Sequence, residues 1–162
     1  MEKKYFVNPT QLAAAGATAL ATAVLAVTLM GLRRPVSALV FLVIAVVFGR
    51  IALETGAWIV VNPDGVSRRL FGRTTMSMTW DEMGEVGVAG AGIFNKGNPD
   101  KTGTLYIYFS RTPMTEEERF SMMLSWPPKD KLYLQHDKYR MDFIQSIYGR
   151  KIQKFNTGKV KV

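Results

Sequence analysis

The first third of the chain is dominated by long apolar runs. Leu12 to Leu32 carries no charged side chain, and at 1.5 Å per residue it reaches about 31 Å, enough to cross a hydrocarbon core of about 30 Å. After Arg33-Arg34-Pro35, a second apolar run extends from Val36 to Leu53, with Arg50 placed to snorkel toward headgroups. The pattern predicts two antiparallel transmembrane helices, about 12–32 and 36–53, which with a short N-terminal tail make up residues 1–56.

Two other interpretations of these runs stay open. A secretory signal peptide would have Lys3 and Lys4 as its basic region and Ala21-Thr22-Ala23 as its cleavage site, but the apolar run is longer than such a region and a second run follows at once. A buried helical hairpin of a soluble protein would need a larger core than the remaining hundred or so residues offer. Membrane spans are therefore favoured.

Small residues recur in both runs at a spacing of four. We predict that Ala13 and Ala17 of the first helix pack against Ala45 and Gly49 of the second, because small side chains let helix backbones approach closely in lipid. An Ala-rich composition alone is the competing explanation. No Asp, Glu, His, Asn or Gln lies between Leu12 and Gly49, which argues against an ion pathway or proton relay through the membrane.

Lysine and arginine residues near the span ends predict the orientation. The outer ends of the two spans carry more of them than the turn does: Lys3, Lys4, Arg68, Arg69 and Arg73 against Arg33 and Arg34. By the positive-inside rule we expect both termini in the cytoplasm. The protein is then a two-span protein of the cell membrane.

From Ala57 onward the hydrophobic period shortens to two, which is typical of strands. Asn62-Pro63-Asp64-Gly65 is a strong turn between two of them, since Pro presets φ and Gly accepts a positive φ. The third strand, Thr75 to Trp80, places Met76 and Met78 on the same face as Trp80. The runs predict about six strands in all.

Two helices complete residues 57–155. Thr115 and Glu118 form a capping box, which predicts an inserted helix over about 115–125. Asp137 predicts the start of a last helix, which Gly149 ends. The fold class is therefore a membrane α-hairpin followed by an α+β domain. We expect its core where four side chains meet beneath the last helix: Trp80, Leu105, Ile107 and Ile144.

This order resembles the bacterial PH-like domain families, over about Ala57 to Lys154. The likeness rests on the Asn62–Gly65 turn and on Trp80-Asp81-Glu82-Met83, where these families often carry W-E/D-D/E-I at the end of the third strand. Lys131–Leu134 and the helix from Tyr139 to Tyr148 fit the closing strand and the capping helix. The inserted helix departs from the simplest pattern. The resemblance implies a PH-like antiparallel β-barrel or sheet capped by a C-terminal helix, and a protein- or lipid-interaction module rather than an enzyme.

The composition limits the chemistry. The chain has no cysteine and a single histidine, His136, so it lacks the residues for a disulfide, a thiolate site or a His cluster. Asp81, Glu82 and Glu85 are interpreted as a solvated turn, because a general acid–base pair needs opposed groups in one cleft. His136-Asp137 lacks a nucleophile motif. We predict no catalytic, cofactor-binding or metal-binding residues.

Basic side chains are the strongest functional signal in a chain with a net charge of +8. Membrane lipids are the expected partner, together with a protein that the sequence does not identify; self-association is left open, and nucleic acid is not expected. The competing explanation for the same charges is an ordinary positive-inside bias together with a solubilising basic tail, residues 156–162. The candidate contact residues form two groups: Arg68, Arg69 and Arg73, and Arg150, Lys151 and Lys154.

The sequence therefore predicts a non-enzymatic, membrane-anchored protein. Its PH-like domain would bind a protein or anionic lipid at the cytoplasmic face. The alternative is an accessory or regulatory subunit whose hairpin packs against a larger membrane complex.

Overall fold

The structure is a computed structural model that describes residues 2–90 and 104–154. The predicted basic tail, residues 156–162, lies outside the described residues. The chain forms two compact units. The helical unit is Phe6–Ala57, and the β-unit combines Met1–Tyr5 with Trp58–Val162.

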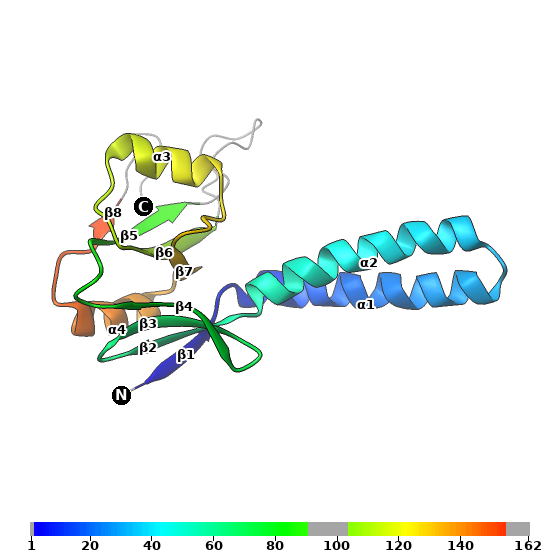
Figure 1. Ribbon diagram of the computed structural model, residues 1–162, viewed down its shortest axis with the longest axis horizontal. Coiled ribbons are helices and arrows are strands. Elements are labelled where there is room, and N and C mark those ends of the chain that lie inside the picture. The colour runs from blue at the N-terminus through cyan, green and yellow to red at the C-terminus, as the bar shows by residue number, and fades with distance from the viewer. Residues whose placement is uncertain (1, 91–103, 155–162) are drawn as a thin grey trace. The chain divides into compact units, whose positions relative to one another are not determined.

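The helical unit consists of α1 (Pro9–Gly31) and α2 (Pro35–Thr55), drawn in blue and cyan in Figure 1. A proline occupies the first turn of each helix, where its missing N–H costs nothing. Asn8 caps α1, since its side chain accepts a hydrogen bond of 3.0 Å from the Gln11 amide. Both helices are long and apolar enough to cross a membrane, by length and composition.

The buried seam between α1 and α2 differs from the prediction. The buried small residues are Ala15, Ala26 and Ala38. Ala13 and Ala17 are exposed, and Ala45 is half-buried. A Cβ on Gly49 would meet nothing within 4 Å. The predicted face of α1 is wrong: the seam includes Ala15, and residues two positions away on an α-helix, such as Ala13 and Ala17, point to nearly the opposite side, about 200° around the axis.

Backbone hydrogen bonds close the base of the helical unit. The Val7 amide donates to the Ala57 carbonyl at 3.1 Å, and the Asn8 amide donates to the Thr55 carbonyl at 3.2 Å. A Cβ on Gly56 would come within 2.9 Å of the Leu12 side chain, so glycine allows the close approach there. The start of α1 and the end of α2 are therefore held together.

The first sheet of the β-unit begins before the helices. Its strands are β1 (Lys3–Phe6), β2 (Trp58–Asn62), β3 (Gly65–Leu70) and β4 (Arg73–Thr79), paired in that order. The prediction of an N-terminal tail within residues 1–56 is therefore wrong for β1, which belongs to the domain. Four residues, Lys-Lys-Tyr-Phe, are too short to display a strand period.

Side chains of α4 (Lys138–Tyr148) contact β1. The Lys3 amine lies 4.1 Å from the centre of the Phe143 ring, and the Arg140 guanidinium lies 5.3 Å from that of Tyr5. Cation–π contacts of this kind attract when the cation sits within about 6 Å of the ring. The N-terminal strand thus joins the last helix as well as the sheet.

The second sheet has the order β7-β6-β5-β8. Its strands are β5 (Glu85–Gly90), β6 (Leu105–Ser110), β7 (Leu132–Gln135) and β8 (Gln153–Lys154), with α3 (Glu116–Leu124) between β6 and β7. All pairs but β5–β8 are antiparallel. The predicted six strands and two helices are present, and the α+β class is confirmed: two long apolar helices, antiparallel sheets and a C-terminal helix.

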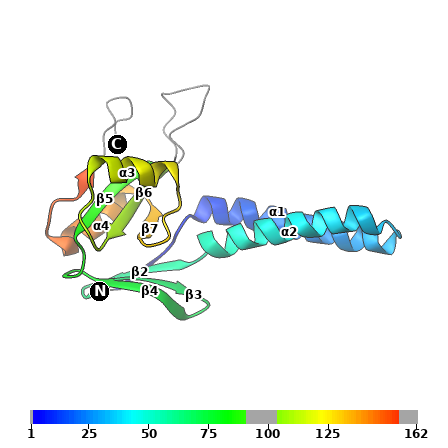
Figure 2. The same cartoon turned by 45° about the horizontal axis from the view of Figure 1, so that its top comes forward.

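The core lies between the two sheets, where β7 packs against β2 and β3. Figure 2 shows the sheets facing each other, with α3 over the outer face of the second. This cover explains why every residue of β5 is buried, on both faces of the strand. Ile107 and Ile144 are fully buried, at 0% exposure.

Two predicted core residues are only half-buried. Leu105 is the first residue of β6, at the edge of the core. Trp80 lies just after β4, with its ring centre 6.3 Å from Phe109 and 5.7 Å from Tyr148. Its indole N–H donates to the Asn62 carbonyl at 2.9 Å, so the polar end of the ring needs an accessible position near that turn.

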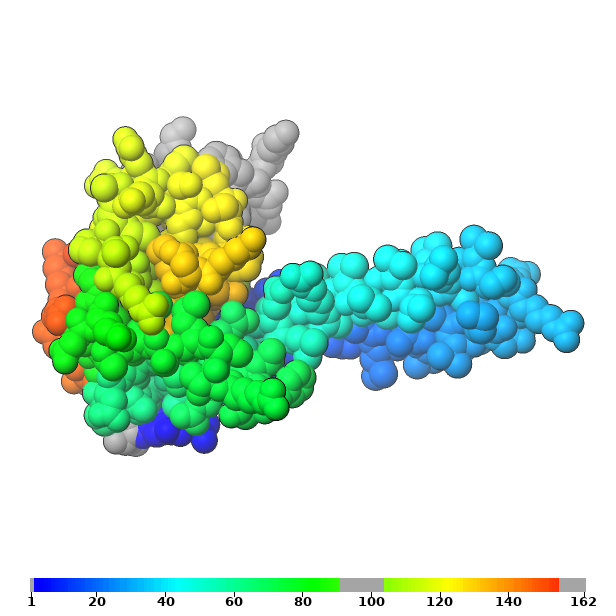
Figure 3. Space-filling model, in the orientation of Figure 1, coloured from blue at the N-terminus to red at the C-terminus, as the bar shows by residue number. Residues whose placement is uncertain are grey.

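The outer edge of β4 is occupied by side chains. The Arg111 guanidinium donates to the Ser77 carbonyl at 3.0 Å, and the Glu82 carboxylate accepts from the Thr79 amide at 2.9 Å. Space-filling atoms of β4, in green, lie at the surface in Figure 3. Side chains bonded to an edge strand reduce its ability to pair with another strand.

Replacing Ala15 by Leu should destabilise the helical unit. Ala15 is 3% exposed, so the larger side chain must force α1 and α2 apart, at a cost of about 1–3 kcal/mol. Ala13→Leu and Ala17→Leu make the same change at exposed positions of the same helix and should cost little. Thermal unfolding of the full-length protein in detergent measures all three, and equal losses at Ala13 and Ala15 would contradict this packing.

The β-unit should require β1 for full stability. A chain of residues 57–162 lacks β1, whereas residues 1–6 joined to residues 57–162 by a short Gly/Ser linker retain it. We expect the joined chain to be more stable by roughly 1–3 kcal/mol, the scale of losing a set of native contacts. Chemical denaturation of the two chains tests this. The same midpoint for both would mean that β1 adds nothing.

Candidate functional site

The candidate basic residues lie in or beside two different sheets. Arg68 and Arg69 belong to β3, and Arg73 begins β4. The second group follows α4: Arg150 and Lys151 precede β8, which ends with Lys154. The structure therefore divides the predicted basic set into a β3–β4 group in the first sheet and a C-terminal group beside the second.

Arg150 has structural contacts of its own. Its guanidinium donates to the Met83 carbonyl at 3.1 Å and lies 5.6 Å from the Tyr148 ring centre. Gly149 takes a positive φ of 67° and ends α4, as predicted, so the chain turns there and brings Arg150 back toward Met83. The guanidinium of Arg150 thus stabilises the end of α4. Lys151 and Lys154 are exposed.

The turn between β3 and β4, which we call the Leu70–Arg73 tip, carries an apolar side chain that was not predicted as functional. Phe71 is 79% exposed. Its φ is 48° and that of Gly72 is 78°, the two positive values of a tight hairpin turn. A phenylalanine at a position that favours Asn, Asp or Gly is the sequence signal that could have identified it.

Trp58 and two arginines accompany this tip. Arg69 is the ladder partner of Trp58 on β2, and Leu70 is the partner of Arg73 on β4. Trp58 is 39% exposed. The tip therefore combines exposed aromatic surface with guanidinium groups on both strands.

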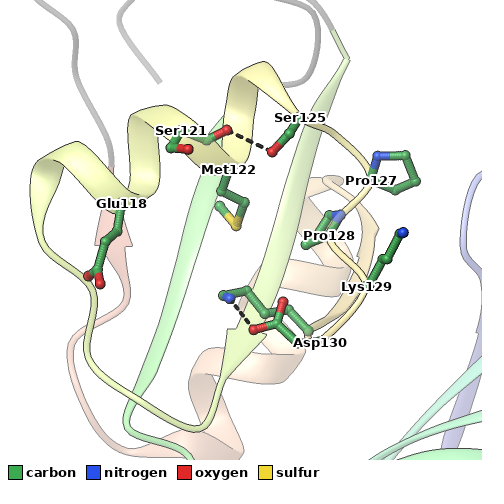
Figure 4. A pocket seen from close by; sticks show the side chains of 9 residues that line it. Glu118, Ser121, Met122, Ser125, Pro127, Pro128, Lys129 and Asp130 are labelled. Atoms are coloured by element: carbon green, nitrogen blue, oxygen red, sulfur yellow. Dashed lines mark hydrogen bonds and ion pairs between the residues drawn. The ribbon is translucent and has the colours of Figure 1, made fainter.

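A second surface feature is a hollow of about 380 Å³ beside α3. Met122 points into it from α3, and Asp130 lies on its other side, paired with Lys131 at 2.7 Å (Figure 4). This hydrogen bond lowers the pKa of Asp130. The residues that line the hollow come from α3 and from the segment that precedes β7: Glu118, Ser121, Met122, Ser125, Pro127, Pro128, Lys129, Asp130 and Lys131.

A buried carboxylate holds α3 against the second sheet. Glu85, at 5% exposure, accepts hydrogen bonds from Arg119 Nε and Nη2, each at 2.8 Å. It also accepts from the Met114 amide at 3.0 Å and from the Tyr108 hydroxyl. The interpretation of Glu85 as part of a solvated turn is therefore wrong, because partners distant in sequence satisfy its charge.

The network shifts the pKa values of its members. Burial alone would raise the pKa of Glu85, but the hydrogen bonds from Arg119, Met114 and Tyr108 outweigh it and lower that pKa. The hydrogen bond to Glu85 raises the pKa of Arg119, and burial raises that of Tyr108, helped by the same carboxylate. The ionised Glu85–Arg119 pair and the neutral Tyr108 are therefore the stable forms.

Gly87 makes room for this network. It is the ladder partner of Tyr108, and a Cβ on Gly87 would overlap the Tyr108 hydroxyl. A glycine within a strand often marks such a close approach. Gly87 therefore lets the Tyr108 ring cross β5 and reach Glu85, two residues away on the same face.

Asp137, which follows the single histidine, has a structural role. The Asp137 side chain accepts from the Tyr139 amide at 2.9 Å and caps α4, as predicted. Within residues 2–90 and 104–154, no group of three or more His, Cys, Asp or Glu side chains is placed to hold a metal ion.

The chain was compared with protein families, curated proteins and solved structures. No family model, no curated protein and no solved structure matches the chain.

Breaking the Glu85–Arg119 pair should strongly destabilise the β-unit. Arg119→Met leaves a buried carboxylate without its cation, which costs about 3–5 kcal/mol. Pairing this change with Glu85→Gln should recover part of the loss, because no buried charge then remains. Glu117→Gln, at an exposed position of the same helix, is the control. Denaturation of the full-length protein measures each variant; a double variant as unstable as the single one would contradict the account.

The Glu85–Arg119 pair should make the free energy of unfolding depend on pH in the acidic range. Because the folded-state pKa of Glu85 lies below its ordinary value of 4.5, the ionised form adds stability above about pH 4.5. That contribution is lost as the pH falls from there through the folded-state pKa. The unfolding free energy should therefore fall less steeply below pH 4.5 in the Glu85→Gln/Arg119→Met variant than in the parent. Parallel profiles would show that other carboxylates carry the whole effect.

Proposed function

We propose that this is a non-enzymatic, two-span protein of the cell membrane whose PH-like domain binds a protein or anionic lipid at the cytoplasmic face. One observation carries the proposal. β1, which precedes α1, and β2, which follows α2, are neighbours in one sheet. β1 comes before the two spans in the sequence and β2 comes after them, so the two strands can pair only if both lie on the same side of the membrane. Two crossings return the chain to that side.

The surface of the helical unit supports membrane insertion. Large apolar side chains along both helices are exposed, among them Leu20 at 69%, Val27 at 74% and Val36 at 77%. Apolar surface of this extent is unfavourable in water, at about 25 cal/mol per Å², and is solvated by lipid tails. The signal-peptide alternative fits less well, since cleavage after Ala23 would remove β1 from its sheet.

The order of elements supports the PH-like assignment. Six strands, β2 to β7, form two facing sheets, and a helix follows, α4. β1, β8 and α3 are additions to that plan. Glu85 is the buried carboxylate that would be considered first for acid–base catalysis, but it is paired with Arg119. This pairing favours a binding role over acid–base chemistry.

An accessory subunit is the second candidate, and one observation favours it. Residues near the turn between α1 and α2 line an apolar hollow of about 570 Å³, among them Ala26, Met30, Ala38 and Leu42. Such a hollow accepts side chains of another transmembrane helix as well as a lipid tail. In this case the helical unit, not the β-unit, would bind the partner.

Single-cysteine labelling tests the topology, and the parent chain has no cysteine to interfere. Ser37→Cys lies near the start of α2, and Asp64→Cys lies in the exposed turn between β2 and β3. In intact cells, an impermeant thiol reagent should react with the cysteine at 37 and should reach the one at 64 only after lysis. The reverse pattern would place the β-unit outside the cell.

Photocrosslinking in native membranes separates the two candidate functions. A photoreactive side chain at Val43, an exposed position of α2, should give only lipid adducts if the β-unit is the binding element. The accessory-subunit hypothesis requires a specific protein adduct at Val43. The same probe at Leu124, an exposed position of α3, serves as the comparison on the β-unit.

A further inference from the structure

In the Leu70–Arg73 tip, Phe71 combines an unfavourable backbone conformation with an exposed apolar side chain. Left-handed backbone is unfavourable for residues with a Cβ, and phenylalanine gains no local hydrogen bond there as Asn or Asp would. Phe71 adopts this conformation, with φ 48°, yet its side chain is 79% exposed and adds little to the core. The tip thus holds an apolar ring in water at a position where polar residues are favoured.

The charge around the ring has one sign. The stretch from Gly65 to Trp80 contains three arginines and no acidic residue. Arg69 lies immediately before the tip and Arg73 closes it, so both flank Phe71 closely. An exposed ring beside cationic groups is complementary to the surface of an anionic bilayer, where rings enter the interface and guanidinium groups contact phosphate.

Strand register limits how far the tip can lie from the end of α2. β2 starts at Trp58, three residues after the last residue of α2, and three peptide steps span at most about 11 Å. Arg69 is opposite Trp58, about 5 Å away in an antiparallel ladder, and Phe71 follows two residues later. Phe71 is therefore within roughly 25 Å of the end of α2 by chain geometry alone.

We propose that the Leu70–Arg73 tip is a membrane-contacting element: Phe71 inserts at the headgroup–acyl boundary, and Arg69 and Arg73 contact anionic lipid headgroups. The proposal rests on the membrane anchoring of the proposed function and assigns the lipid contact to one turn. Trp58, opposite Arg69, would lie at the same interface, where Trp is enriched. Of the predicted basic residues, the proposal assigns the lipid contact to Arg69 and Arg73 of the β3–β4 group.

The experiment places a reporter beside the tip and leaves Phe71 intact. Thr74→Cys, at an exposed position next to Arg73, is labelled with an environment-sensitive fluorophore in the full-length protein. Asp64→Cys is the matched control, because it lies in the exposed turn at the other end of β3. Both proteins are reconstituted in vesicles of phosphatidylcholine, with or without phosphatidylglycerol, and quenched with acrylamide.

In vesicles with phosphatidylglycerol, we expect the label at 74 to be quenched at least twofold less than the label at 64. Phe71→Ser and the Arg69→Gln/Arg73→Gln double variant should each raise quenching at 74 toward the control value. High salt should do the same, because the screening length falls from about 10 Å at 0.1 M to about 3 Å at 1 M. Phosphatidylcholine alone should give weaker protection.

Two results would overturn the proposal. One is equal quenching of the labels at 74 and 64 in vesicles with phosphatidylglycerol, and the other is protection at 74 that Phe71→Ser leaves unchanged. Labelling at 37 and 64 in intact cells reports the anchoring independently. If that pattern holds while the tip stays accessible to acrylamide, the anchor stands and the tip faces water or a protein.

Discussion

The pairing of β1 with β2 is the constraint on which the rest of the molecule depends. It makes the apolar helices an insertion within one domain rather than an appendage before it, since the chain leaves the sheet after Phe6 and returns at Trp58. Only two residues connect a strand to a helix on each side: Val7 and Asn8, and Gly56 and Ala57. The backbone bonds from Val7 and Asn8 to residues 57 and 55 close this crossing point. The helices and the sheet are therefore joined by very short segments of chain.

The second sheet has a different anchor. Its outer face would be exposed without α3, and α3 is held there by Arg119, whose partner Glu85 lies on β5. The carboxylate also fixes the segment before α3 through the Met114 amide, so the capping box at Thr115 starts the helix from a fixed point. Because Arg119, Met114 and Tyr108 all bond to Glu85, the position of α3 and the neutral form of Tyr108 depend on the same buried charge.

Local patterns predicted most elements of this fold, and long-range contacts account for the errors. The turn at Asn62–Gly65 and the caps of α3 and α4 depend on neighbouring residues, so the sequence displays them directly. The burial of Glu85 depends on Tyr108 and Arg119, which are 23 and 34 residues away. The helix seam passes through Ala15 rather than Ala13 because alanines recur on every side of the first half of α1, so their spacing alone does not select a face. At the candidate site, Arg69 and Arg73 were predicted from charge. Phe71 was not predicted, because the candidate contact residues were selected by charge and an apolar residue next to Gly72 carries none.

Under the proposed membrane anchoring, the side chains along the edge of β4 have a consequence for neighbouring copies of this protein. Confinement to two dimensions raises the effective concentration of neighbouring domains and holds them in similar orientations, which favours strand pairing between them. The Ser77 carbonyl and the Thr79 amide would be the first groups to pair with an approaching strand, and Arg111 and Glu82 already occupy them. Arg111 and Glu82 therefore oppose the pairing of neighbouring copies through this edge of the first sheet.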